Sequence, residues 1–342
     1  MSAPERGGAR VASRAGFMKA IVQDTYGGPE VLELRDVAVP VPKDDEVLVR
    51  VRASSVNAAD WHLMRGKPYF MRLVGFGIRA PKVRVRGMDV AGVVEAIGSK
   101  VTTVRVGDEA YGQGDMHAGT FSELAVVKET SLAAKPASLT FEEAGAVPLA
   151  ALTALQGVRD SGGVKAGQRM LINGASGGVG TFAVQIARAL GAEVTAVCST
   201  RNVELLQELG ADRVIDYTRE DFTRTGERYD VVFDLVANRS LTALRRALTP
   251  RGTLVLSGGG GGKLLGPMPL IIRAALVNVF VGQRLTNLAE SVNSADLAYL
   301  AGLIEKGDVK PVIERVYPLA ETAAAIRQLE DEHARGKLAI TL

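Results

Sequence analysis

The fold follows from the stretch MLINGASGGVG at residues 170–180 and its continuation TFAVQIA at residues 181–187. An apolar run enters a glycine-rich turn and an apolar run of helical spacing leaves it, which predicts a strand, a tight turn and the start of a helix. Backbone N–H groups and the helix dipole make such a turn a site for a diphosphate, and its glycines let the backbone approach closely. We therefore expect four residues to bind a dinucleotide, with the serine hydroxyl as a further donor: Ser176, Gly177, Gly178 and Val179.

The context of this turn supports a dinucleotide site over an ordinary strand–helix turn. The fingerprint spacing would be Ala175-x-Gly177-x-x-Gly180, with alanine where the first glycine is usual, and Gly174 is available for the tight turn. Gly191-Ala192 and a second strand at residues 193–198 follow the helix. The whole forms one strand–helix–strand unit of about 30 residues, as the fingerprint requires.

The alternation of strands and helices continues beyond this unit. We expect helices at 203–209 and 240–247, and strands at 213–216, 230–234 and 253–257. This order predicts an α/β fold with a doubly wound parallel sheet. Such sheets bind ligands beyond the carboxyl ends of their strands, which adds Ser257 and Gly258 as candidate cofactor-binding residues.

The rest of the chain reads differently. Residues 18–130 contain short strands and many turns, which favours a barrel-like β domain; those strands are expected at 19–23, 32–37, 46–53, 90–97 and 124–127. The C-terminal part reads helix, strand, helix, strand, and its last strand, at 338–341, could rejoin the first domain. Residues 1–17 are expected to be a flexible tail, and the long apolar loop at 68–81 is either a lid or a loop packed on the body.

Composition narrows the class of protein. The chain has 342 residues, enough for two domains, with 47% hydrophobic and 23% charged residues, as in ordinary globular proteins. The formal net charge is +3 and no Lys/Arg run reaches five residues, so nothing indicates a nucleic-acid partner. One cysteine, Cys198, excludes an internal disulfide and is compatible with a cytoplasmic location. No apolar run is long enough to predict a membrane span.

Four further motifs carry a resemblance: RGMDVAGVV at 86–94 followed by Gly98, VGDEAYG at 106–112, GADRVIDY at 210–217 and HARGK at 333–337. Together with the glycine-rich turn, they resemble the medium-chain dehydrogenase/reductase superfamily over residues 18–342. The resemblance implies a GroES-like β-rich catalytic domain made of residues 18–145 and 283–342. It also implies an inserted Rossmann domain, residues 146–282, that binds the cofactor.

The resemblance does not extend to a zinc site. Zinc alcohol dehydrogenases of the superfamily use an early cysteine, a His-Glu pair and a later cysteine or acid, and they carry a four-cysteine lobe. This sequence reads SSVNAAD at 54–60 and Met88-Asp89 at those positions, and the lobe is absent. His62 and His117 lack further ligands at an evident spacing, so we expect no metal.

The zinc-free branch that the chain most resembles is the quinone oxidoreductases (zeta-crystallin-like), with their enone and enoyl reductase relatives. Asn57-x-x-Asp60 matches the Asn-x-x-Asp of that branch, and the resemblance implies that both residues lie near the nicotinamide. The resemblance also makes Thr153 a neighbour of the nicotinamide, although its hydroxyl could simply bond its own helix. His62 is a further catalytic candidate, with a packed or surface histidine as the alternative.

The end of the second strand indicates the cofactor. NAD enzymes usually carry an acid there for the ribose 2′-hydroxyl, but residues 198–202 read CSTRN. Ser199, Thr200 and Arg201 would instead bind the 2′-phosphate of NADPH, unless the two hydroxyls only cap the next helix. The resemblance adds three cofactor contacts: Tyr217, His333 and Arg335.

These observations predict hydride transfer from NADPH to an apolar or conjugated carbonyl substrate, namely a quinone or an α,β-unsaturated carbonyl. A conjugated acceptor delocalises the added charge onto oxygen, where a few hydrogen-bond donors stabilise it without a metal. An NADP-dependent alcohol dehydrogenase or carbonyl reductase, a dedicated enoyl reductase and a nucleotide-binding structural or sensor protein remain as alternatives. Residues 274–281, AALVNVFV, resemble the edge strand through which family dimers join their sheets, with a core strand as the alternative.

Overall fold

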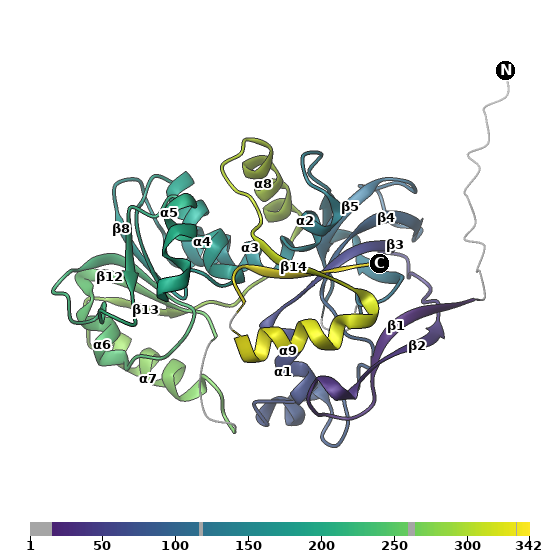
Figure 1. The fold of residues 1–342 in the computed structure, drawn as a ribbon, viewed down its shortest axis with the longest axis horizontal. Helices are drawn as coiled ribbons and strands as arrows, with labels where there is room; N and C mark the ends of the chain where they lie inside the picture. Colours follow the sequence, from purple (N-terminus) through teal and green to yellow (C-terminus); the bar gives the residue numbers. More distant parts are fainter. Residues whose placement is uncertain (1–15, 116–118, 259–263, 333) are drawn as a thin grey trace.

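The computed structural model describes residues 16–115, 119–258, 264–332 and 334–342 (Figure 1). The first strand, β1 (Phe17–Gln23), already begins at the last residue of the expected tail, and residues 1–15 lie outside the described part. β1 pairs antiparallel with β2 (Leu32–Ala38), so Phe17 faces Ala38 across a regular two-stranded ladder. The tail prediction is therefore wrong for Phe17.

The β-rich part is a seven-stranded sheet with the path β14-β15-β3-β4-β5-β7, and β6 pairs with β3 off this path. The strands are β3 (Glu46–Val56), β4 (Asp89–Ile97), β5 (Glu109–Gln113), β6 (Leu124–Lys128), β7 (Leu132–Ala134), β14 (Ile313–Pro318) and β15 (Lys337–Thr341). The last strand does rejoin the first domain, as expected, because β15 runs antiparallel to β3 with Leu338 opposite Val56. Three helices accompany this sheet: α1 (Ala58–Arg65), α2 (Phe141–Gly145) and α9 (Thr322–Glu332).

The second sheet has six parallel strands in the order β10-β9-β8-β11-β12-β13. Its strands are β8 (Arg169–Asn173), β9 (Glu193–Cys198), β10 (Arg213–Asp216), β11 (Tyr229–Asp234), β12 (Leu248–Leu256) and β13 (Arg284–Asn287). Its helices are α4 (Gly178–Ala189), α5 (Val203–Glu208), α6 (Leu241–Arg246) and α7 (Met268–Asn278). The doubly wound prediction is confirmed, and the strand order reverses between β8 and β11, where such sheets bind ligands.

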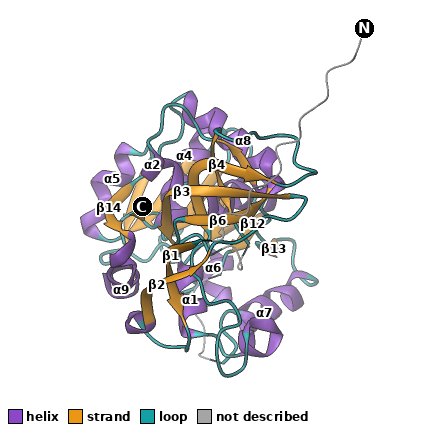
Figure 2. Ribbon diagram, turned by 90° about the vertical axis from the view of Figure 1, so that its right-hand side faces the viewer, coloured by secondary structure: helices purple, strands orange, loops and turns teal. Residues whose placement is uncertain are grey.

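Two details of this sheet correct the sequence-based expectations. Strand β13 belongs to the parallel sheet, although the expected domain boundary at residue 282 leaves it out. Residues 274–281 do not form the edge strand, because most of them lie in helix α7, which begins after Pro267. A continuous apolar run does not distinguish a strand from a helix, whereas a proline in the first turn favours a helix. Helix α7 lies at the lower edge of the molecule in both views (Figures 1 and 2).

One hydrophobic cluster joins the two sheets. Helix α3 (Pro148–Leu155) lies between them, and α8 (Ser294–Glu305) packs on α3 (Figure 1). Buried Ala91 and Tyr111 of the antiparallel sheet pack in the same cluster as Met170 and Phe182 of the nucleotide-binding part. Tyr111 donates a hydrogen bond of 2.6 Å to the Leu297 carbonyl, which joins β5 to α8. These contacts therefore fix the antiparallel sheet relative to α3, α8 and the parallel sheet.

The loop at 68–81 is pinned on both of its sides. The Arg72 guanidinium stacks over Tyr26 and Tyr69, at 4.2 Å and 4.9 Å from the ring centroids. The Phe70 N–H donates to the Leu264 carbonyl, 3.2 Å away, in the segment between β12 and α7. The loop therefore packs on the body and also contacts the nucleotide-binding part. Among the described residues, no helix combines the length and apolarity needed to cross a bilayer.

Candidate active site

The glycine-rich turn joins β8 to α4 and has the geometry of a phosphate cradle. Gly174 adopts a left-handed conformation, with φ of +88°, and Gly177 caps the helix in an extended conformation. A Cβ on Gly180 would lie 2.3 Å from the Gly174 carbonyl oxygen, so this turn closes only around glycine. The first N–H groups of α4 have no partner within the helix and face this turn. The residues from Ser176 to Val179 therefore fit the diphosphate of a dinucleotide.

The C-terminal HARGK segment lies against this turn. The Gly336 N–H donates to the Ser176 carbonyl at 2.8 Å, and Gly336 forms an isolated parallel bridge with Gly177. The position of a Cβ on Gly178 is 2.8 Å from Cδ of Lys337, so the lysine stem packs on the first residue of α4. Arg335 is exposed beside this contact, and its main-chain N–H donates to Glu314. His333 lies outside the described residues.

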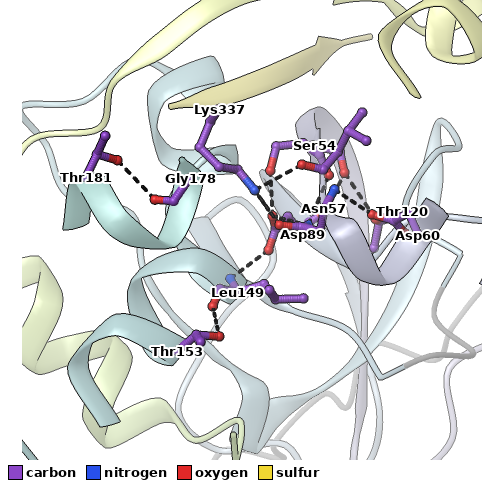
Figure 3. Close-up of polar contacts among 12 residues, drawn as sticks. Ser54, Asn57, Asp60, Asp89, Thr120, Leu149, Thr153, Gly178, Thr181 and Lys337 are labelled. Atoms are coloured by element: carbon purple, nitrogen blue, oxygen red, sulfur yellow. Dashed lines mark hydrogen bonds and ion pairs between the residues drawn. The ribbon is translucent and has the colours of Figure 1, made fainter. Parts of the chain in front are cut away.

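Lys337 ends in a buried polar cluster (Figure 3). Its Nζ donates to Asn57 Oδ1 and to the Val56 carbonyl, 3.2 Å away, and lies 3.4 Å from Asp89 Oδ2. Asp89 also accepts from Asn57 Nδ2 at 2.8 Å and from the Ser55 hydroxyl at 2.5 Å. Lys337 is 3% exposed and Asp89 0%. Burial lowers the pKa of the Lys337 amine, and the nearby Asp89 and Asp60 oppose this effect. The lysine amine, paired with Asp89, and the Asn57 amide are therefore held in fixed positions between the antiparallel sheet and the glycine-rich cofactor turn.

Asp60 supports this cluster from helix α1. Its Oδ2 accepts the Asn57 N–H at 2.9 Å and so fixes the first turn of α1. Its Oδ1 is buried without a hydrogen-bond partner. Burial raises the pKa of the Asp60 carboxyl to about 7, and the nearby Asp89 adds to the shift. Asp60 therefore positions Asn57, and its carboxyl stays protonated up to pH values well above those usual for an aspartic acid.

The other two catalytic candidates occupy different places. The Thr153 hydroxyl donates to the Leu149 carbonyl at 2.7 Å, and the Leu149 N–H donates to Asp89 Oδ1 at 2.8 Å (Figure 3). Thr153 is thus connected to Asp89 through the main chain of Leu149. The His62 ring instead packs at a tilt against the Trp61 ring, with 4.3 Å between ring centroids, and burial lowers the pKa of His62. The structure brings Asn57, Asp60 and Thr153 together and gives His62 a packing role.

The expected 2′-phosphate residues lie at the end of β9, with two neighbours that sequence reasoning missed. Buried Asn202 donates from Nδ2 to Ser176 Oγ at 3.0 Å and to Ser199 Oγ at 3.4 Å, which ties this segment to the glycine-rich turn. The Thr200 hydroxyl donates to Asp216 Oδ2 at 2.5 Å, and this bond is the main reason that the pKa of Asp216 is lowered. An acid therefore does lie at this edge, contributed by β10.

Thr200, Arg201 and Tyr217 are exposed at this edge. Tyr217 follows β10 directly, and its N–H donates to the Cys198 carbonyl at 3.0 Å. Ser257 follows β12, and its N–H donates to the Asp234 carbonyl at 3.1 Å. Gly258 comes next, with φ of +63°. The carboxyl ends of β9, β10, β11 and β12 thus bring the remaining cofactor candidates to one edge of the sheet.

Comparison with known proteins agrees with this architecture. Family models match residues 43–137, as "Alcohol dehydrogenase GroES-like domain", and residues 209–340, as "Zinc-binding dehydrogenase". The mouse protein named NAD(P)H oxidoreductase RTN4IP1, mitochondrial, is 33% identical over 99% of this chain and 93% of its own length. The Arabidopsis thaliana protein named NADPH-dependent alkenal/one oxidoreductase, chloroplastic, is 33% identical over 94% of this chain and 79% of its own.

A solved structure of the quinone oxidoreductase from Coxiella burnetii is 29% identical, covers 95% of this chain and 99% of its own, and superposes with a TM-score of 0.84. This chain belongs to the quinone oxidoreductase branch of the medium-chain dehydrogenase/reductase superfamily. The oxidoreductase has no group of three or more His, Cys, Asp or Glu side chains that could hold a metal ion within residues 16–115, 119–258, 264–332 and 334–342.

Proposed function

We propose that this oxidoreductase uses NADPH to reduce quinones or the C=C bond of α,β-unsaturated carbonyls, without zinc. The observation that carries the proposal is the Lys337 ammonium, which contacts Asn57 and Asp89 while its stem packs on Gly178 of the cofactor turn. When bound, NADPH supplies the hydride. Positive charge held beside the cofactor turn favours an acceptor that becomes negative at oxygen. The alkenal/one and quinone oxidoreductases named above support this substrate class.

In this proposal, the two sheets have separate tasks. The turn at Ser176–Val179 binds the diphosphate, and the edge formed by Ser199, Arg201 and Tyr217 binds the adenosine end. Residues 18–145 and the C-terminal segment form the catalytic domain, and the parallel sheet from about residue 146 through β13 forms the cofactor domain. The substrate would enter between them, beside Asn57.

The direct test follows NADPH absorbance with the purified full chain and a panel of quinones, enones, isolated aldehydes and alcohols. We expect turnover with quinones or enones and little with isolated carbonyls. Oxidation of NADPH by isolated aldehydes alone, or NADP-dependent oxidation of alcohols, would make it a carbonyl reductase or alcohol dehydrogenase. Tight NADPH binding with no turnover on the whole panel would leave the sensor alternative.

Arg201→Ala is expected to raise the KM for NADPH about 10-fold and to leave the KM for NADH nearly unchanged, because only NADPH carries the 2′-phosphate that a guanidinium binds. Initial rates with both cofactors measure this. Arg251→Ala is the matched control, since Arg251 is exposed in the first half of β12. It lies away from the edge formed by the carboxyl ends of the parallel strands, which we call the ligand edge. Equal changes for the two cofactors would remove Arg201 from the phosphate site.

Metal removal is expected to leave the activity unchanged. Burial raises the pKa of the Cys198 thiol to about 11, so the single cysteine is not the thiolate that zinc prefers. The Asp89 carboxylate is already paired with an ammonium. We expect metal analysis of the purified chain to find no stoichiometric zinc, and dialysis against a chelator to preserve turnover. One equivalent of zinc, with activity lost on chelation and restored by zinc, contradicts this.

The chain is also proposed to form a homodimer and to be cytoplasmic. Strand β13 pairs only with β12 among the described strands, so one edge of the parallel sheet is unpaired. Beside it, α7 and the residues after it expose Leu276 (64%), Val279 (79%) and Phe280 (86%). Light scattering after size-exclusion chromatography tests the dimer, and a monomer at micromolar concentration contradicts it. Cell fractionation tests the location, since the mouse and Arabidopsis relatives are named as mitochondrial and chloroplastic.

A further inference from the structure

Two side chains near the cluster keep buried polar atoms without partners. Gln113 ends β5 directly opposite Asp89 of β4, and it is 2% exposed. Its Nε2 donates to Glu290 Oε2 over a long 3.4 Å, while Gln113 Oε1 and Glu290 Oε1 have no hydrogen-bond partner. A buried unpaired polar atom costs about 1–3 kcal/mol, so two of them on facing side chains need a reason. A bound ligand that donates or accepts there supplies one.

The position of Glu290 is fixed by the chain around it. The Ser291 N–H donates to Gln156 Oε1 at 2.9 Å, and Gln156 Nε2 donates back to the Ser291 carbonyl at 2.7 Å. The Leu288 N–H donates to the Leu256 carbonyl at 2.8 Å, which holds the segment at the carboxyl edge of the parallel sheet. Gln156 follows Thr153 by three residues, so both lie on the same side of the α3 helix as it continues. Glu290 is therefore held at the ligand edge, not on a loose loop.

The surroundings of Glu290 favour its neutral form. Burial is the largest influence and raises the pKa of its carboxyl. The Gln113 hydrogen bond opposes this, and the charge of Asp89 adds a smaller upward shift. Two further charged groups are linked to this segment through Gln156: Asp296, which accepts from Gln156, and Arg159, which pairs with Asp296. A neutral carboxylic acid in such a site is a hydrogen-bond donor and a source of one proton.

We propose that Glu290 is the proton donor of the reduction and that Gln113 positions its carboxyl. The inference rests on the proposed function. Hydride adds to the β-carbon of an enone, the C=C electrons form a new double bond to the carbonyl carbon, and the C=O π electrons move to oxygen. The Glu290 O–H bond breaks as its proton bonds that oxygen. The enol then becomes the ketone in water, and Glu290 recovers a proton from solvent. With a quinone, the same two transfers give the hydroquinone.

The test compares two acceptors that differ in their need for an acid. An enolate is strongly basic, whereas the anion of an electron-poor hydroquinone is weakly basic and forms without help. Glu290→Gln keeps the shape and loses the transferable proton. We expect kcat to fall about 100-fold for the enone, the scale of general acid catalysis, and far less for the quinone.

The pH dependence is a second measurement. In the wild type, kcat for the enone should fall as pH rises through the pKa of Glu290, and Glu290→Gln should lose this fall at high pH. Glu321→Gln, an exposed glutamate before α9, is the control.

A second variant separates chemistry from folding. Glu290→Ala opens space for a small acid, so added formate is expected to restore enone turnover in proportion to its acid form. Equal losses for both acceptors, enone turnover within about threefold of the wild type, or no rescue by formate in a folded variant that binds NADPH each overturn the proposal. Failure of the proposed function is distinct, because the wild-type chain would then reduce neither acceptor.

Discussion

Lys337→Met is expected to lower the free energy of unfolding by about 3–5 kcal/mol and to abolish NADPH oxidation. The substitution keeps the stem that packs on Gly178 and removes the ammonium. Asp89, which is 0% exposed, then keeps a buried carboxylate without its cation, and Asn57 loses the donor that orients its amide. Breaking one side of a buried ion pair costs far more than the pair contributes as a whole, because the remaining charge stays desolvated.

Urea unfolding, followed by circular dichroism, measures the stability loss. Lys306→Met is the matched control, since Lys306 is exposed at the end of α8, and its change should stay within about 0.5 kcal/mol. The double variant Lys337→Met/Asp89→Asn should be more stable than Lys337→Met alone, because the uncompensated charge is gone. A Lys337→Met protein as stable and as active as Lys306→Met would show that the ion pair has no energetic role.

The cofactor turn was predictable because its signal is local. Gly174, Ser176 and Gly180 stand within seven residues, and the geometry that needs glycine there depends on the same few residues. Asn57 and Asp60 were singled out by the resemblance, through their Asn-x-x-Asp spacing, and the structure places both in the first turn of α1. What each of these residues contacts, however, depends on other parts of the chain.

Lys337 shows where sequence reasoning stops. It stands in the HARGK motif, but its role appears only when β15 pairs with β3, which brings it to Asn57 across 280 residues. Asp89 was considered only as a missing zinc ligand, although it is the acceptor at the centre of the cluster. Asp216 was missed because it lies on β10, whose carboxyl end meets that of β9 at the same edge. A rule that pairs the last residues of neighbouring parallel strands would have found it.

The errors of element assignment have a similar origin. Residues 268–278 are apolar without a clear period, and only Ala274 among them is buried. Because this helix has no buried face, its sequence lacks the helical periodicity from which it could have been predicted. Glu290 is the opposite case: a charged residue in a loop reads as exposed, and only the Gln156–Ser291 pairing and the facing Gln113 reveal its buried carboxyl.

Gly180→Ala is expected to weaken NADPH binding about 100-fold, which corresponds to about 2.7 kcal/mol. In an ordinary helix this change stabilises the protein by about 1 kcal/mol, because alanine is the better helix former. At Gly180 the new Cβ would lie 2.3 Å from the Gly174 carbonyl oxygen and 2.6 Å from the Ala175 carbonyl carbon, both of them backbone atoms. The turn must open to admit the methyl group, and the N–H groups that we propose bind the diphosphate move with it.

Gly302→Ala is the matched control, because Gly302 also lies in a helix, α8, and a Cβ there meets no atom within 4 Å. We expect Gly302→Ala to keep the NADPH affinity of the wild type and to melt at the same temperature or higher. Fluorescence titration gives the affinities, and the rise of the melting temperature with added NADPH gives an independent measure, since a ligand stabilises only the form that binds it. If Gly180→Ala binds NADPH as tightly as Gly302→Ala, this result contradicts the prediction. The turn then does not bind the diphosphate, and the diphosphate binds at another part of the ligand edge.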